Sequence, residues 1–183
     1  MSRIEGLLKA YEEFVAQPWA QNLSGAEKVW FAVYEPARER RLLFRIPEFE
    51  TATVKAGHGW AHLDVSGFFA DWRANHKYRE AYVEEPAAMD LALRGFANDA
   101  AAHVRQALTA PGVDENTVMA ISGVGGLFGL VRTSTIIDQV TSAIRGRLLV
   151  FFPGRYESSQ YRLLDARDGW NYLAIPIIAK NGD

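Results

Sequence analysis

Closely spaced glycines follow an apolar segment in MAISGVGGLFGLVRTSTIID, residues 119–138. A strand that runs through glycines into a helix points several backbone N–H groups at one spot, and the helix dipole there favours an anion. Gly123, Gly125 and Gly126, with Arg132 further along the predicted helix, therefore form a candidate loop for phosphate or a nucleotide.

The spacing of these glycines departs from two nucleotide-binding motifs. The ATPase phosphate loop, G-x-x-x-x-G-K-[ST], uses a lysine and a hydroxyl that this loop lacks. In the dinucleotide motif G-x-G-x-x-G, Gly123 and Gly125 fill the first two positions, but Phe128 takes the third and Gly129 comes one residue late. The alternative, which we favour, is that the glycines permit a tight turn and a close approach of helix to strand.

A second loop is predicted in FFPGRYESSQYRLLD, residues 151–165, where Pro153 and Gly154 follow an apolar run. Ligands usually bind at the carboxyl edge of an open α/β sheet, so Arg155 and Tyr156 are candidate ligand contacts there. They would line one crevice with the glycine loop if the two strands are neighbours. The alternative is a plain surface turn with an exposed arginine and a packed tyrosine.

The histidines and Ser122 form no complete catalytic or metal-binding set. His58 and His62 are four residues apart, but the surrounding glycines disfavour a helix, and His62 with Asp64 lacks the third ligand that zinc requires. Ser122 precedes a glycine without the G-x-S-x-G elbow of hydrolases. We therefore predict no catalytic residue, no metal site and no cofactor.

Strand and helix patterns alternate along the chain, which predicts an α/β fold. Strands are expected at 28–36, 60–65, 116–122, 147–154 and 170–178, and helices at 4–15, 67–82, 86–110 and 127–144. The segment 36–57 is expected to be a crossover that Pro47 interrupts, and its Arg38, Arg40, Arg41 and Arg45 are expected to form a solvated face. The expected architecture has three layers, a mostly parallel sheet flanked by helices, as in Rossmann-like or degenerate P-loop-like proteins.

The composition fits a single domain over residues 1–183. Hydrophobic residues make up 49% of the chain, which is ample for a globular core. The absence of cysteine and of any apolar run long enough for a signal or a membrane span favours a cytoplasmic protein. A net charge of −2 disfavours direct nucleic-acid binding.

The segments ISGVGGLFGLVRTSTIIDQV, LLVFFPGRYESSQYRLLD and NYLAIPI, in this order and spacing, resemble the BrxB family of bacterial BREX phage-defence systems. The likeness is close over roughly the last third of the chain and loose over the earlier strands. The family's motif positions are occupied by Gly123, Val124, Gly125, Arg132, Pro153, Gly154 and Tyr156. The chain has Gly129, Ser134 and Leu173 where members usually carry proline, histidine and arginine.

The resemblance implies a cytoplasmic, non-catalytic component encoded beside a DNA methyltransferase, an alkaline-phosphatase-like protein and a large ATPase. We expect an adaptor that binds such a defence protein and contacts nucleic acid only through its partners. Self-association into a homo-oligomer is an open alternative. The expected contacts are the C-terminal strand edge and the exposed members of Trp19, Trp60, Trp72, Arg155 and Tyr156. The competing hypothesis is a regulatory domain that binds a nucleotide or phosphate through a degenerate glycine loop.

Overall fold

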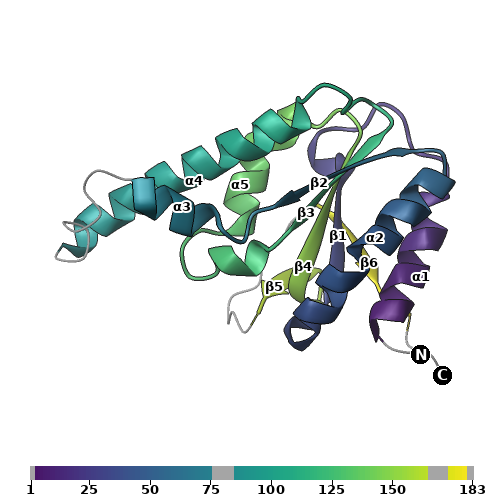
Figure 1. Cartoon of the computed structure of the whole chain (residues 1–183), viewed down its shortest axis with the longest axis horizontal. Coiled ribbons are helices and arrows are strands. Elements are labelled where there is room, and N and C mark those ends of the chain that lie inside the picture. Colours follow the sequence, from purple (N-terminus) through teal and green to yellow (C-terminus); the bar gives the residue numbers. More distant parts are fainter. Residues whose placement is uncertain (1–2, 76–84, 165–172, 181–183) are drawn as a thin grey trace.

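The computed structural model describes residues 3–75, 85–164 and 173–180, which form an open α/β sheet with helices on both faces (Figure 1). Five parallel strands lie in the order β2-β3-β4-β1-β6, and a sixth, β5, pairs antiparallel with the end of β4. Their bounds are β1 Val29–Tyr34, β2 Gly59–Asp64, β3 Thr117–Ser122, β4 Arg147–Glu157, β5 Gln160–Leu163 and β6 Ile175–Ile178. The prediction of a mostly parallel sheet flanked by helices is confirmed.

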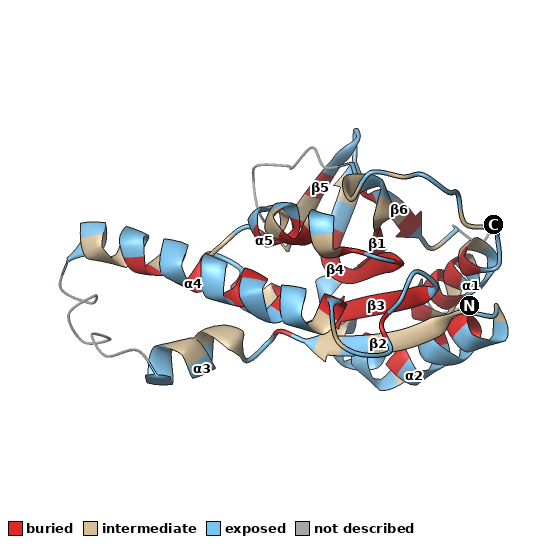
Figure 2. Ribbon diagram, turned by 90° about the horizontal axis from the view of Figure 1, so that it is seen from above, coloured by how far each residue is buried: buried red, intermediate tan, exposed pale blue. Residues whose placement is uncertain are grey.

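Helices cover the two faces of the sheet separately. One face carries α1 (Arg3–Val15) and α2 (Glu39–Lys55); the other carries α3 (Phe68–Asn75), α4 (Pro86–Leu108) and α5 (Thr133–Val140). Side chains of β1 alternate between the two cores, with Trp30 packed toward α1 and α2 and Phe31 toward the other layer. Both faces are buried, which explains the unbroken apolar run in this strand (Figure 2).

The predicted break at Pro47 is wrong, because α2 is continuous from Glu39 to Lys55. Proline removes one intrahelical hydrogen bond, at a cost of about 3 kcal/mol in a helix interior. Pro47 is exposed, so the Leu43 carbonyl that loses its donor lies on the solvent side. The opposite side of the helix is fixed by Leu42 and Phe49, both fully buried, and this packing outweighs the local penalty.

The predicted helix over 127–144 is also wrong in its first part. The chain after β3 forms a short 3-10 turn, η4 (Val124–Leu127), and the α-helix begins only at Thr133. Phe128 leaves the helical region with ψ 131°, and Gly129 takes a left-handed φ of 75°. A left-handed residue cannot continue a right-handed helix, so the two helical pieces are separate.

Pro153 and Gly154 lie inside β4 rather than at a turn, which corrects the second loop prediction. The chain reverses at Ser158 and Ser159, both with positive φ, as in a two-residue hairpin turn. A Cβ on Gly154 would stand 1.9 Å from the carbonyl oxygen of Arg162, so glycine lets β5 approach. The predicted helix over 67–82 and strand over 170–178 extend beyond the described residues, which show α3 ending at Asn75 and β6 starting at Ile175.

Candidate ligand and partner groove at the carboxyl edge

The connections that leave β1 and β4 run to opposite faces of the sheet. The chain after β1 passes to α2 on one face, whereas β5, which follows β4, packs Tyr161 and Leu163 into the core of the other face. The two strands are parallel neighbours, paired from Val29–Leu148 to Tyr34–Pro153. Such a divergence leaves a crevice outside the carboxyl ends of the strands, and this is where open α/β sheets usually bind ligands.

A groove of about 1200 Å³ occupies this position. Its walls come from the exposed side of α1, the residues that end β1, the end of β4, and the residues after β6. Arg155 and Tyr156, predicted as ligand contacts, line it together with Tyr34. We call this site the carboxyl groove.

The charged residues that line the carboxyl groove are four cations and two carboxylates, a net charge of +2. Arg3 forms an ion pair with Glu35, and Lys180 Nζ lies 2.5 Å from Glu13 Oε2. The hydrogen bond from Lys180, with a further contribution from Lys9, lowers the pKa of Glu13.

The other two cations of the groove, Lys9 and Arg155, form no salt bridge in the described part of the chain. Their charge is therefore available to an anionic group of a ligand or partner.

Tyrosines form the fixed floor beside these cations. The hydroxyl of Tyr34 donates to Glu39, and burial together with this carboxylate raises the Tyr34 pKa. Tyr156 packs on Tyr161 with ring centroids 4.7 Å apart, and the Tyr161 hydroxyl donates to the Ala174 carbonyl at 2.6 Å. These contacts hold the tyrosine rings in place, which reduces the reorganisation that binding of a partner would require.

The glycine loop follows β3 and packs against Ser66, in the connection between β2 and α3. Gly123 has φ 83°, and a Cβ there would stand 2.6 Å from the backbone nitrogen of Ser66. A Cβ on Gly126 would lie 2.8 Å from the Ser66 carbonyl oxygen. These close approaches match the structural alternative, although the partner is the connection between β2 and α3 rather than the helix that follows.

The predicted site residues thus separate into two places. Gly125 touches β4 through Pro153, since a Cβ there would stand 3.6 Å from the Pro153 ring, but the glycine loop does not line the carboxyl groove. Arg132 is exposed at the N-cap of α5, several residues beyond η4. Because the loop leads into a 3-10 turn, the α-helix dipole invoked for phosphate binding is not at the glycines.

The tryptophans considered as exposed contacts are half-buried and packed. Trp19 stacks on His58 at 3.8 Å, and the guanidinium of Arg147 lies 4.7 Å from the Trp19 ring centroid. Trp72 packs on Phe96 and belongs to the core beneath α4. Of the five residues in that set, only Arg155 is exposed.

Sequence reasoning missed a contact between His62 and Ser122. His62 Nε2 lies 2.8 Å from Ser122 Oγ, because β2 and β3 are parallel neighbours that pair Asp64 with Ser122. Burial lowers the His62 pKa, and the carboxylates of Asp64 and Glu50 oppose that shift. Ser122 is only 1% exposed and Asp64 Oδ1 accepts the Ser66 N–H at 2.9 Å, so the contact holds two strands together rather than presenting a nucleophile.

Two absences hold for the part of the chain that the structure describes. No three side chains from histidine, cysteine, aspartate and glutamate gather there as a metal would require. None of its helices has the length and apolar character that crossing a bilayer takes.

The topology and the carboxyl groove define an open-sheet α/β protein with a groove at a topological switch point. The family model of BREX protein BrxB matches residues 73–177, more than half of the 183 residues. The chain therefore belongs to the BrxB family and is a BREX phage-defence component, as its motifs had indicated. Searches of curated proteins and of solved structures gave no match.

The family match runs from the end of α3 to β6. It includes the glycine loop and the β4–β5 hairpin, and it leaves out α1, β1, α2 and β2. The carboxyl groove is built from both parts, since Arg155 lies inside the matched range and Lys9 outside it.

Proposed function

We propose that this chain is a non-catalytic adaptor of a BREX system, which holds a segment of another defence protein in the carboxyl groove. The size and lining of that groove carry the proposal. Small-molecule sites usually measure about 300–1000 Å³ and have few charged groups, whereas this groove is larger and bears four cations. Arginine and tyrosine, here Arg155 and Tyr156, are enriched in protein interfaces.

The C-terminal strand extends this contact surface. β6 is paired with β1 alone among the described residues, and its far edge offers backbone groups to a partner strand. Leu173, Ile175 and Ile178 are exposed on and beside it, and Ile178 also lines the groove. An acidic, partly apolar segment of a partner fits this combination of charge and surface.

The proposed partners are the alkaline-phosphatase-like protein and the DNA methyltransferase of the same system, as the family resemblance implies. Nucleic acid would then be reached through these partners, and the location would be the cytoplasm. A homo-oligomer is the alternative in which a second copy supplies the segment.

The non-catalytic role is supported by how the polar side chains are engaged. The Ser122 hydroxyl is buried against His62, and the Asp64 carboxylate binds backbone. A reaction in the carboxyl groove would need a nucleophile or an acid–base pair, but its carboxylates Glu13 and Glu35 are in ion pairs with Lys180 and Arg3.

Binding measured with purified proteins tests this function. The full chain is mixed with each purified protein of its BREX system, and association is followed by calorimetry at low and high salt. We expect one of these proteins to bind, with an affinity that falls as salt rises. The double variant Lys9→Glu with Arg155→Glu should lose this binding. Arg94→Glu on α4, also an exposed arginine, is the matched control; equal loss with this control, or no binding at all, would contradict the proposal.

The nucleotide hypothesis predicts a different result. A nucleotide or phosphate at a hundredfold excess over its Kd would stabilise the chain by about 2.7 kcal/mol, visible as a thermal shift. The closed packing of the glycine loop against Ser66 leads us to expect no shift with ATP, GTP, S-adenosylmethionine or phosphate. A shift that Arg132→Ala abolishes would restore that hypothesis.

A further inference from the structure

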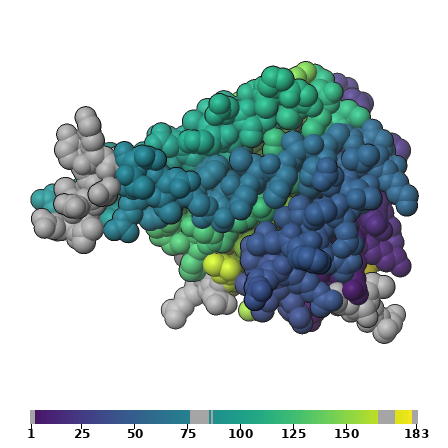
Figure 3. Space-filling view, viewed as in Figure 1, coloured from purple at the N-terminus to yellow at the C-terminus, as the bar shows by residue number. Residues whose placement is uncertain are grey.

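The outer side of α2 carries a row of exposed apolar side chains. We define the α2 stripe as Leu43, Phe44, Pro47, Thr51 and Val54, which follow the helical spacing of three or four and therefore share one side. Phe44 is 86% exposed, Val54 58% and Leu43 42%. Figure 3 shows this helix, coloured blue, on the face turned to the viewer.

This row is separate from the side by which α2 packs on the protein. Leu42, Ile46 and Phe49 point into the core shared with α1 and the sheet. The helix is thus apolar on two sides, and only one of them is covered by the described residues. An amphipathic surface helix normally has charged residues on its outer side.

We propose that the α2 stripe is a second docking surface, which receives an amphipathic helix of a partner protein with acidic residues at both ends of its apolar row. Two cations decide the charge of that partner. Arg40 and Lys55 bound the stripe on its own side of the helix, fifteen residues or about 22 Å apart. Neither forms a salt bridge in the described ranges.

Most other charges near the stripe are already paired, whereas Glu50, exposed between its two ends, forms no salt bridge among the described residues. Arg45 hydrogen-bonds Glu48 through two nitrogens, each at 2.7 Å, and lies 3.2 Å from Glu5. This hydrogen bond lowers the Glu48 pKa, so the carboxylate stays charged and engaged with Arg45. The unpaired charge along the stripe is therefore positive at each end, which is complementary to acidic ends on an incoming helix.

Pro47 adds a polar feature to the middle of the stripe. Because proline has no N–H, the carbonyl of Leu43 has no donor four residues later, and it lies on the exposed side. A partner helix with an asparagine, glutamine or serine at its centre can donate to this oxygen. The apolar row, the carbonyl that lacks its usual helical donor and the end cations together specify one kind of occupant.

A second copy of the chain fits the same surface poorly. Two copies related by a twofold axis would pack their α2 helices either antiparallel, with Arg40 of one against Lys55 of the other, or parallel, with each cation against its own counterpart. Like charges would then meet at both ends of the contact. The stripe is therefore assigned to a different protein, and the same chain could hold one partner there and another in the carboxyl groove.

Two synthetic helical peptides test the assignment. Both carry the same apolar row with a central asparagine; one has glutamates and its twin has lysines at two positions fifteen residues apart. Fluorescence anisotropy with the full chain gives their affinities. The glutamate peptide is expected to bind about tenfold more tightly, with the preference shrinking at high salt, since two surface ion pairs replace two repulsions.

Variants of exposed residues complete the test, and circular dichroism verifies that each is folded. Phe44→Ala should abolish binding of the glutamate peptide, and Arg40→Glu with Lys55→Glu should transfer the preference to the lysine peptide. The matched controls lie on α4, where Leu91 is 71% exposed and Arg94 is exposed: Leu91→Ala with Arg94→Glu should change neither affinity.

Three outcomes would overturn the assignment. These are equal binding of the two peptides, loss of binding in the α4 control, and a dimer in sedimentation that Phe44→Ala dissociates. The last result would assign the stripe to a second copy. Because Lys9 and Arg155 are unchanged in all these proteins, failure here is distinguishable from failure of the groove proposal.

Discussion

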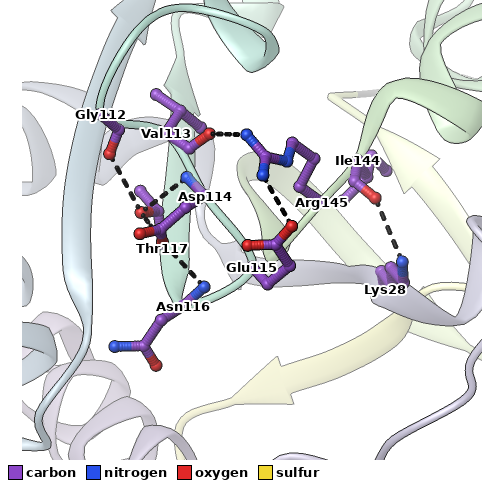
Figure 4. A network of polar contacts seen from close by, with 9 residues as sticks. All are labelled: Lys28, Gly112, Val113, Asp114, Glu115, Asn116, Thr117, Ile144 and Arg145. Atoms are coloured by element: carbon purple, nitrogen blue, oxygen red, sulfur yellow. Dashed lines mark hydrogen bonds and ion pairs between the residues drawn. The ribbon is translucent and has the colours of Figure 1, made fainter.

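The two ends of the parallel strands differ in how their polar groups are used. At the amino edge, where β1, β3 and β4 begin, side chains close the loops by hydrogen bonds (Figure 4). Lys28 donates to the Ile144 carbonyl, and Arg145 binds both the Val113 carbonyl and Glu115. At the carboxyl edge, the divergence of β1 and β4 leaves the carboxyl groove with two cations, Lys9 and Arg155, that form no salt bridge among the described residues.

The amino edge also fixes its carboxylates as charged groups. Asp114 Oδ1 accepts the Asn116 N–H and the Thr117 hydroxyl, each at 2.9 Å, and these bonds lower the Asp114 pKa. The hydrogen bond from Arg145 lowers the pKa of Glu115. Saturated polar groups stabilise a fold, whereas unsaturated ones can recognise a partner, so we assign the amino edge to structure and propose the carboxyl edge for binding.

The largest expected effect on stability is at Gly123, where the carboxyl edge is closed by packing against Ser66. Gly123→Ala forces a side chain into a left-handed conformation and against Ser66, so we expect a loss of about 2–5 kcal/mol in the free energy of unfolding. Gly125→Ala, with only ordinary contact to Pro153, should change it by less than about 0.5 kcal/mol. Urea unfolding measures both; equal losses would mean that the loop is not held by Ser66.

A smaller loss of stability is expected at the amino edge. Thr117→Val keeps the shape but removes the hydroxyl that donates to Asp114 and accepts its N–H, at a cost of about 1–2 kcal/mol. Thr135→Val, at an exposed position of α5, is the control. Partner binding should be unaffected by Thr117→Val, and a binding defect there would break the assignment of the amino edge to structure.

The carboxyl groove should show the reverse behaviour. Lys9→Glu with Arg155→Glu should weaken partner binding about tenfold or more while leaving the urea midpoint nearly unchanged, because both side chains are exposed and form no salt bridge in the described ranges. Calorimetry and unfolding on the same preparation check this. A large drop in stability with unchanged affinity would show that the two edges do not divide structure from binding.

The smallest expected effect is on the pH dependence of stability, through His62 on β2. The folded chain holds His62 with a lowered pKa, so below about pH 6.5 the unfolded chain binds more protons and stability falls as pH drops toward the folded pKa. His62→Gln should remove this component of the pH dependence. Urea midpoints from neutral to mildly acidic pH measure it, and an unchanged slope in the variant would contradict the lowered pKa of His62 in the folded chain.

Some elements could be predicted because their signals are local. The unbroken apolar run Val29–Tyr34 indicated a strand buried on both faces, and the periodicity of 86–110 indicated a long helix. The hairpin at Ser158 and Ser159 could not be found this way, since neither residue is a usual turn former for positive φ. Pro47 misled for a related reason: its penalty is local, whereas the packing of Leu42 and Phe49 that outweighs it is tertiary.

The candidate sites follow the same division. Arg155 and Tyr156 could be placed near a strand end from residue type and order, but the sequence had no means to show that α1 supplies Lys9 to the same groove. His62 and Ser122, sixty residues apart, meet only because β2 and β3 are neighbours. The exposure of Phe44 could not be seen in the segment 36–57, which was expected to be a crossover interrupted at Pro47.

By itself the sequence determined the layer architecture, the alternation of strands and helices, and membership of the BrxB family, because apolar periodicity and short motifs are properties of contiguous residues. The tertiary structure alone decided the strand order and, with it, the carboxyl groove, the closed glycine loop and the uncovered side of α2. These depend on which crossovers diverge and which faces find a neighbour, and such contacts join residues whose separation along the chain carries no local signal.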